Sequence, residues 1–270
     1  MEADSWEDRR SAEIYAEIVR RGTLYRDLAA RLVALAQPCE HDVVLDLATG
    51  TGIVIENVLA RARSAPQLVG LDRSRAMLHV ARQAIPFQEV TWLRADPAAL
   101  PLVDASATLL FSSAAFWHFP RRREVLAEAA RVLRPGGRLA FNLPSAQLVD
   151  EREDEILPIQ VALAREGERR FGRSPEPGGP MVVCAELRED IVAAGLSLDA
   201  EETIAVRGVQ QEVLDLLEVS AVGGRFYPEV DQADRRAWIV AVAGRVDPDE
   251  EIAVRWRHFL ATRPVGAGKE

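Results

Sequence analysis

Three aspartates have positions that could hold a nucleotide-like ligand. Asp46, Asp72 and Asp96 each stand at or just after the end of a short apolar run. Because the carboxyl ends of neighbouring parallel strands meet at one edge of a sheet, we expect the three carboxylates to face one ligand there. Carboxylates accept hydrogen bonds from hydroxyl and amino groups and attract positive charge. The pattern therefore favours a ligand that carries ribose hydroxyls and an amino group.

A glycine turn follows the first of these runs. The apolar, partly β-branched residues 43–47 are broken by Gly50 and Gly52, and a helix-like stretch comes next. Such a strand, turn and helix lets the backbone approach a ligand, and the N–H groups of the helix's first turn face it. Asp46 would repel the pyrophosphate of a dinucleotide but would attract an amino group. The order Asp-x-x-x-Gly-x-Gly also differs from the dinucleotide fingerprint Gly-x-Gly-x-x-Gly.

Residues 43–54 resemble motif I of the class I S-adenosylmethionine-dependent methyltransferases, in the methyltransferase type 11 group that includes quinone-biosynthesis C-methyltransferases. Ala48 stands where that motif usually has its first glycine. A second similar string, residues 130–139 (Ala-Arg-Val-Leu-Arg-Pro-Gly-Gly-Arg-Leu), ends a helix at proline and turns at glycine. The resemblance covers residues 43–143. It implies an α/β fold, a three-layer α/β/α Rossmann-like sandwich with a seven-stranded, mostly parallel sheet, an antiparallel last strand and a helical cap.

The resemblance implies S-adenosyl-L-methionine as the donor and S-adenosyl-L-homocysteine as the product. By this resemblance, Asp72 would accept hydrogen bonds from both ribose hydroxyls, and Tyr15 would reach the methionine part. Asp96 would accept a hydrogen bond from the adenine amino group, and Ala95 and Pro97 would flank the base. The predicted cofactor-binding residues are Tyr15, Asp46, Ala48, Thr49, Gly50, Gly52, Asp72, Arg73, Met77, Ala95, Asp96, Pro97 and Ser112.

Several of these residues have a structural alternative. Asp72 could instead cap the helix that begins near Ser74. Met77 fits either the adenine or the core, and Tyr15 and Tyr25 could simply pack on the core.

An aromatic loop, residues 113–120, follows the fourth predicted strand. Ligands of open parallel sheets bind at this end, so the loop should face the acceptor, and its aromatic walls suit a planar or lipophilic small molecule. The predicted substrate-binding residues are Ser113, Phe116, Trp117, Tyr25, Phe226 and Tyr227. Core packing is the alternative for each of these aromatics. An Asn-Pro-Pro-Tyr sequence, typical of amino-group methylation of adenine or glutamine, is absent.

Histidine could supply a general base, which methyl transfer needs only when the acceptor must lose a proton. His118 is the candidate, because it lies in the loop after the fourth strand and an imidazole has an ordinary pKa near 6.5. His41, His79 and His258 fall before the first strand, within a helix and in the last strand, where structural roles are expected.

Hydrophobic periodicity places the elements that position these residues. Helices are predicted over residues 11–37 (two, divided near Gly22), 52–63, 121–133, 156–171, 185–194, 210–222 and 231–246, and strands over residues 43–47, 67–72, 89–94, 105–112, 138–143, 197–206 and 251–262. Residues 150–155 form a charged connection and residues 173–180 a loop. We expect an N-terminal helical lid over residues 1–40, a cofactor-binding Rossmann-like core over 41–144, and the remaining strands with an inserted cap over 145–270.

Composition limits the function classes. The 270 residues are 48% hydrophobic and 28% charged, as in a globular protein, and no apolar run approaches the length of a membrane span. A net charge of −9 opposes nucleic-acid binding, which needs clustered cations. Cys39 and Cys184 lack metal-ligand spacing, so no metal site is expected. We expect a cytoplasmic protein with a small-molecule acceptor, no nucleic-acid or membrane partner and a possible homodimer.

The main functional hypothesis is O- or C-methylation of a small molecule, such as a secondary metabolite or a quinone-like compound. Two alternatives stay open: bound S-adenosylmethionine could serve a non-methylating reaction, or the chain could be a non-catalytic subunit. An NAD-dependent reaction is a distant fourth, because Asp46 and the glycine order both oppose it.

Overall fold

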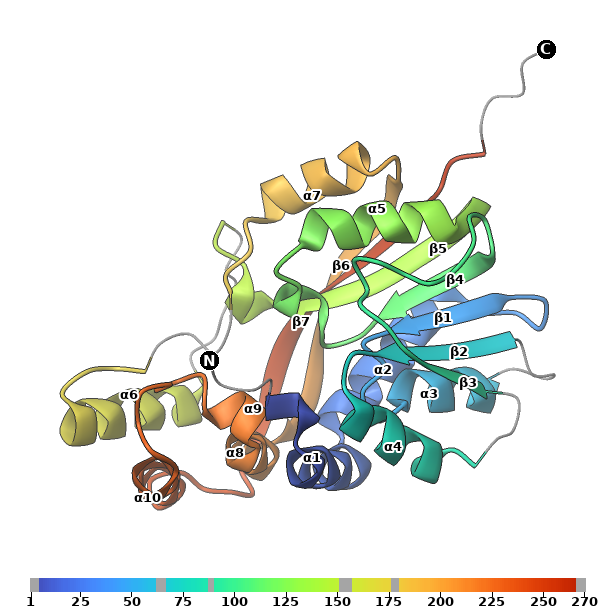
Figure 1. Cartoon of the computed structure of the whole chain (residues 1–270). Coiled ribbons are helices and arrows are strands. Elements are labelled where there is room, and N and C mark those ends of the chain that lie inside the picture. The colour runs from blue at the N-terminus through green and yellow to red at the C-terminus, as the bar shows by residue number, and fades with distance from the viewer. Residues whose placement is uncertain (1–4, 62–66, 87–89, 151–156, 176–179, 266–270) are drawn as a thin grey trace, which may run out of the picture.

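The computed structural model describes residues 5–61, 67–86, 90–150, 157–175 and 180–265, which build one seven-stranded mixed sheet (Figure 1). Its strand order is β3-β2-β1-β4-β5-β7-β6. The strands are β1 Val43–Leu47, β2 Gln67–Asp72, β3 Val90–Arg94, β4 Ala107–Ser112, β5 Leu133–Pro144, β6 Ser197–Val209 and β7 Glu251–Thr262. β1 to β5 pair in parallel, whereas β7 lies antiparallel between β5 and β6. The predicted fold class is confirmed.

Helices cover both faces of the sheet and one of its ends. Helices α5 and α7 lie over one face and α2 and α3 over the other, while α6, α8, α9 and α10 gather as a cap (Figure 1). The helices are α1 Arg9–Arg21, α2 Leu24–Ala36, α3 Ile53–Arg61, α4 Arg75–Ala84, α5 Arg122–Val132, α6 Pro158–Phe171, α7 Cys184–Ala193, α8 Gln210–Glu218, α9 Ser220–Gly223 and α10 Gln232–Ala243. Three short 3-10 turns are η1 Ser5–Glu7, η2 Phe116–His118 and η3 Ser145–Gln147.

The central strands are apolar on both sides because both sides are covered. Leu45 and Leu47 belong to a core cluster with α5 and α7, whereas Val44 between them belongs to the cluster with α2 and α3. In β4, Leu110 faces the first cluster and Leu109 the second. Alternate side chains of a strand point to opposite faces, so an uninterrupted apolar run serves two layers.

Several element boundaries differ from the predicted ones, and three of these differences concern β5, β6 and the helix after β6. β5 begins at Leu133, because residues on both sides of Gly136 pair with neighbours: Leu133 pairs with Ala107, and the Gly136 N–H donates to the Arg263 carbonyl at 2.7 Å. β6 runs three residues further than predicted, to Val209, along β7. The helix predicted over 210–222 divides into α8 and α9.

The cap has a core of its own. Trp238 and Tyr227 are fully buried among apolar residues of α6, α8 and α10. Most of the predicted charged connection and residues 176–179 of the predicted loop lie outside the described residues. Within the part of the chain that is described, no helix has the length and apolar character needed to cross a bilayer.

Candidate cofactor and acceptor site

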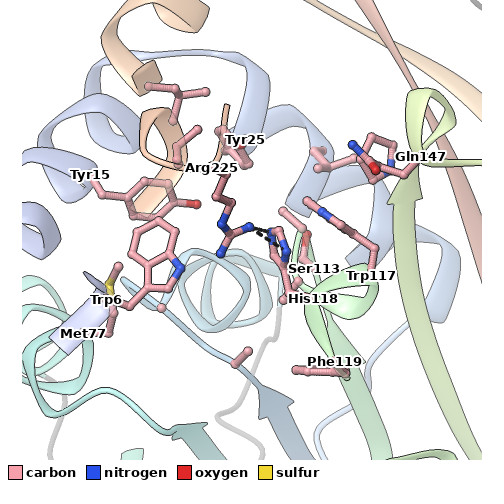
Figure 2. A pocket seen from close by; sticks show the side chains of 18 of the residues that line it. Trp6, Tyr15, Tyr25, Met77, Ser113, Trp117, His118, Phe119, Gln147 and Arg225 are labelled. Atoms are coloured by element: carbon pink, nitrogen blue, oxygen red, sulfur yellow. Dashed lines mark hydrogen bonds between the residues drawn. The ribbon is translucent and has the colours of Figure 1, made fainter. Parts of the chain in front are cut away.

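A large cavity opens at the carboxyl ends of the parallel strands, between the sheet, the N-terminal helices and the cap. Its volume is about 1190 Å³. Figure 2 shows part of its lining, with Trp6 and Met77 at one end and Trp117 and Gln147 at the other. All three aspartates singled out in the sequence line this one cavity. The fold therefore brings them together, as their positions after successive strands predicted.

Asp72 is held by backbone N–H groups on both sides. One carboxylate oxygen accepts from Gly50 N at 2.9 Å and the other from Ser74 N at 2.8 Å. The N-cap of α4 is Ser74 itself, whose hydroxyl accepts from Met77 N at 3.0 Å. Capping is thus performed by Ser74, and Asp72 lies in the cavity lining.

Asp46 is the buried carboxylate of the site, with 1% of its surface exposed. The Thr49 hydroxyl donates to it at 2.6 Å. Burial raises the pKa of Asp46 to about 7 and the negative charge of Asp72 adds to the rise, while the Thr49 hydrogen bond opposes it. A carboxylate in this position favours a neighbouring cation, because a cation would stabilise its charged form.

The turn after β1 has left-handed backbone at Ala48 (φ 55°), Gly50 (φ 53°) and Gly52 (φ 88°). Ala48 and Gly50 line the cavity, but Gly52 does not. A Cβ at Gly52 would lie 2.6 Å from Ile85 Cδ1 and 3.1 Å from the Trp92 ring. Gly52 therefore serves the packing of the turn against the core and is not part of the cavity lining.

Ser112 also lies outside the cavity lining. It is fully buried at the end of β4, and among the described residues its hydroxyl has no hydrogen-bond partner. The neighbouring Ser113 lines the cavity. Adjacent residues at the end of a strand point to opposite sides, so only one of the two serines can face the cavity.

Asp96 shares its carboxylate between two partners. One oxygen accepts from Ala98 N at 3.0 Å and the other pairs with the Arg121 guanidinium. Arg121 immediately precedes α5 and lines the cavity. This arginine was not predicted as a site residue, because nothing in a local sequence pattern relates it to a residue 25 positions away.

The other predicted cofactor-binding residues are found in the lining, namely Tyr15, Thr49, Arg73, Met77, Ala95 and Pro97. Trp6, which was not predicted, joins them from η1. Its ring meets Tyr15 edge-on at 5.3 Å between centroids, and its carbonyl accepts from the Ser74 hydroxyl at 2.6 Å. Trp6 is thus anchored to the helix that follows Asp72.

Aromatic side chains form a continuous wall along the cavity. Edge-on contacts join Tyr15 to Tyr25 at 5.9 Å, Tyr25 to Trp256 at 6.3 Å, and Trp256 to Trp117 at 5.5 Å. Burial raises the pKa of Tyr25 to about 12 and the pKa of Tyr15 well above its usual value. Both phenols therefore stay protonated. The wall joins residues of the N-terminal helices α1 and α2 to residues of η2 and β7, which lie far from them in the sequence.

Two predicted substrate-binding residues lie in cores away from the lining. Phe116 is 1% exposed and stacks on Phe141 at 4.1 Å. Tyr227 is fully buried against Trp238, and its hydroxyl donates to the Arg173 carbonyl at 2.9 Å. Phe116 and Tyr227 therefore pack in cores, which was the alternative to a place in the substrate pocket. Ser113, Trp117, Tyr25 and Phe226 do line the cavity.

His118 meets Arg225, a residue of the cap that the sequence analysis did not single out. Arg225 Nη1 lies 2.7 Å from Nδ1 and 3.0 Å from Nε2 of the imidazole. Burial lowers the pKa of His118 to about 3, and the positive charge of Arg225 contributes. The imidazole is therefore neutral at physiological pH and accepts a hydrogen bond from the guanidinium, which weakens it as a base.

Comparison with known proteins agrees with this geometry. Residues 45–141 match the family described as a methyltransferase domain. The malonyl-[acyl-carrier protein] O-methyltransferase of Methylococcus capsulatus is 40% identical over 100 residues, which cover 37% of this chain and 36% of that protein. The trans-aconitate 2-methyltransferase of Azoarcus sp. is 35% identical over 141 residues, which cover 52% and 51%. The chain thus spans from about a third to half of the length of these relatives.

The fold is also that of a solved methyltransferase. Phosphoethanolamine N-methyltransferase 2 of Haemonchus contortus, in complex with S-adenosyl-L-methionine, superposes with a TM-score of 0.60 at 15% identity, covering 95% of this chain and 57% of that one. With the matched domain and the relatives, the sheet and its glycine turn lead to one assignment: residues 45–141 form a methyltransferase domain of the class I S-adenosylmethionine-dependent type.

Proposed function

We propose that this chain methylates a small-molecule acceptor at oxygen or carbon, a secondary metabolite or a quinone-like compound, with S-adenosyl-L-methionine as donor. The observation that carries the proposal is the convergence of Asp46, Asp72 and Asp96 on one cavity beside the glycine turn. The names of the relatives, which include a trans-aconitate methyltransferase, support a small-molecule acceptor.

The lining residues fit the donor. S-adenosylmethionine supplies an electrophilic methyl group on a cationic sulfonium when it is bound. In this proposal Asp72 accepts hydrogen bonds from the ribose, Asp96 receives the adenine amino group, and Asp46 attracts the positive charge. The buried carboxylate of Asp46 is the strongest sign of fit, since burial raises its pKa and a bound cation would stabilise its charged form.

The cavity has room for two ligands. Its volume of about 1190 Å³ exceeds that of a typical site for one drug-sized molecule. The chain's own contribution to catalysis would be positioning and exclusion of water. Holding two reactants in line can lower a barrier by roughly 7 to 11 kcal/mol. The aromatic wall of Tyr15, Tyr25, Trp256 and Trp117 supplies the rigid, apolar surface that this task requires.

Each part of the chain has a task in this proposal. Residues 1–40 act as the lid over the donor, residues 41–144 as the cofactor-binding core, and residues 145–270 add the outer strands and the cap over the acceptor. The contacts of Trp6 with Ser74 and of Arg225 with His118 support these tasks, because each joins a covering segment to the core.

Product analysis tests the proposal. The protein is incubated with S-adenosylmethionine and a panel of aromatic and polyketide-like compounds, and products are identified by mass spectrometry. We expect one acceptor to gain one CH₂ while an equal amount of S-adenosylhomocysteine forms. Conversion of a compound without S-adenosylhomocysteine would contradict methyl transfer and support the non-methylating alternative.

A further inference from the structure

The cavity continues beyond the aromatic wall into the cap, where α6 and α8 contribute to its lining and α10 packs against both of them. In Figure 1, α6 lies at the outer end of the cap, away from α4 and from β1 to β3. The lining residues of each helix lie about one turn apart, so each helix turns one face toward the cavity. They are Ile159, Leu163 and Ala164 of α6 and Val213, Leu216 and Leu217 of α8.

The chemical character of the lining changes along the cavity. Asp46, Asp72 and Asp96 supply carboxylates at the ends of β1, β2 and just after β3, and the aromatic wall follows. The lining residues of α6 and α8, two helices that are described in full, are aliphatic except for Gln160. The side-chain oxygen of Gln160 already accepts a hydrogen bond from Leu157 N at 2.9 Å. A ligand between these helices would therefore gain affinity mainly by burying apolar surface.

Ala164 leaves space in this part of the cavity. Its side chain is half-buried and lines the cavity, and among the described residues it belongs to none of the apolar core clusters. The adjacent Leu163 is buried and packs in the core of the cap with Trp238. A leucine or phenylalanine at position 164 would extend into the space that alanine leaves. The small side chain of Ala164 therefore serves the cavity, whereas Leu163 also holds the cap together.

We propose that the acceptor carries an aliphatic chain, which lies between α6 and α8 along Ala164 while the reacting end stays beside the aromatic wall. This inference rests on the proposed function and narrows its substrate class to molecules that combine a planar head with an alkyl chain. Aromatic side chains offer flat faces to the head, and aliphatic side chains surround the chain. Each methylene group that becomes buried there should raise the affinity about threefold.

A series of probes with increasing chain length tests the inference. Phenol, 4-propylphenol, 4-pentylphenol and 4-heptylphenol, which are uncharged at neutral pH, are titrated by calorimetry into the protein saturated with S-adenosylhomocysteine. We expect one probe molecule to bind per protein chain and the affinity to rise about threefold with each added methylene group. An affinity that does not rise with chain length, or no binding of 4-heptylphenol, would overturn the inference.

Two matched substitutions on α6 locate the bound chain. Ala164→Phe places a ring in the space between the helices, whereas Val161→Phe adds the same ring on the exposed face of α6. We expect Ala164→Phe to bind phenol as the wild type does but 4-heptylphenol at least about tenfold more weakly, and Val161→Phe to bind both as the wild type does. The same rise in affinity with chain length in Ala164→Phe and in the wild type would contradict the proposed path, and so would an equal loss in both variants. If Ala164→Phe melts below the wild type, Ala164→Val replaces it, with an expected loss of about threefold for 4-heptylphenol alone.

Donor binding separates failure of this inference from failure of the proposed function. We expect the variants at positions 161 and 164 to bind S-adenosylhomocysteine as the wild type does, because α6 lies away from the three aspartates. If 4-heptylphenol and S-adenosylhomocysteine competed for one site, the chain would occupy the donor end of the cavity and the inference would be wrong. A wild-type protein that binds no S-adenosylhomocysteine would instead contradict the proposed function. The probes would then be titrated into the donor-free protein, where a rise in affinity with chain length that Ala164→Phe abolishes would still support the chain site.

Discussion

The carboxylate of Asp72 accepts a hydrogen bond from the backbone N–H of Gly50 at 2.9 Å, which ties the end of β2 to the turn after β1. Its second oxygen accepts from Ser74 N at 2.8 Å, at the start of α4. The turn after β1, the end of β2 and the start of α4 are thereby fixed relative to one another. A carboxylate held in this way is pre-organised for a ribose, so little side-chain freedom has to be lost on binding.

Replacing Asp72 should therefore weaken donor binding. We expect Asp72→Asn to lower the affinity for S-adenosylhomocysteine at least about tenfold, because an amide accepts fewer hydrogen bonds and carries no charge. Calorimetry measures the change. Asp249→Asn, an exposed acid far along the sequence, serves as the control and should bind as the wild type does. An unchanged affinity in Asp72→Asn would remove Asp72 from the ribose.

Asp46 should make donor binding dependent on pH. Its pKa of about 7 means that the carboxylate is partly protonated at neutral pH in the donor-free protein. A ligand with an amino group prefers the ionised form, so the affinity for S-adenosylhomocysteine should rise as pH increases from about 6 to 8 and then level off. Binding of 5′-methylthioadenosine, which lacks the amino group, should vary less. Equal pH profiles for the two ligands would contradict a role for Asp46 toward the amino group.

The same pKa shift predicts how stability changes with pH. Between the usual pKa of 3.8 and the raised value of about 7, the folded protein binds a proton at Asp46 that the unfolded chain releases. This group's contribution to stability is thus present below about pH 4 and is lost as pH rises toward 7. Asp46→Asn should stabilise the donor-free protein at pH 8 by about 1 kcal/mol or more. Thermal unfolding of the wild type and of Asp46→Asn at pH 4 and at pH 8 checks this. A variant that is less stable than the wild type at pH 8 would contradict it.

Trp6 should act as part of the cover over the donor. Removing its ring in Trp6→Ala takes away apolar lining surface next to Tyr15 and should weaken S-adenosylhomocysteine binding by about threefold to tenfold. Trp6→Phe keeps an aromatic ring and should lose less. Intrinsic fluorescence and calorimetry report the two effects, and an affinity in Trp6→Ala equal to that of the wild type would place the donor elsewhere.

A packing prediction concerns the cap. A Cβ at Gly167 of α6 would overlap the Tyr227 hydroxyl, so Gly167→Ala should destabilise the protein by about 2 kcal/mol despite the better helix propensity of alanine. In a Tyr227→Phe background the overlapping oxygen is gone, and the ring carbon that carried it lies 3.1 Å from the added Cβ. In that background, Gly167→Ala should therefore lower the stability of the protein clearly less. An equal loss of melting temperature in both backgrounds would show that Tyr227 is not the cause.

The helices and strands, and the residues proposed to bind the donor, follow from local sequence patterns. Asp46 and Gly50 lie in or just after one apolar run and Asp72 ends the next one, so these local patterns predict all three positions. Local patterns of the same kind also predict the first residues of β6 and β7. The boundaries that failed, such as the start of β5, depend on pairing with distant strands.

The acceptor pocket and the cover over the donor depend on contacts that no local pattern encodes. Arg225 meets His118 across 107 positions, and Trp6 meets Ser74 across 68. Both Phe116 and Trp117 were predicted to line the pocket, but Phe116 is in the core and Trp117 lines the cavity, which depends on how one 3-10 turn is oriented. Composition predicts an aromatic pocket here, but only the tertiary arrangement decides which ring faces it.

The most direct test of the central claim is a calorimetric titration of the wild-type protein with S-adenosylmethionine, S-adenosylhomocysteine and NAD. The carboxylates of Asp46, Asp72 and Asp96 predict micromolar binding of the first two and none of NAD, whose pyrophosphate Asp46 would repel. Binding of NAD, or no binding of either S-adenosyl compound, would contradict the account of the cavity as a methyl-donor site.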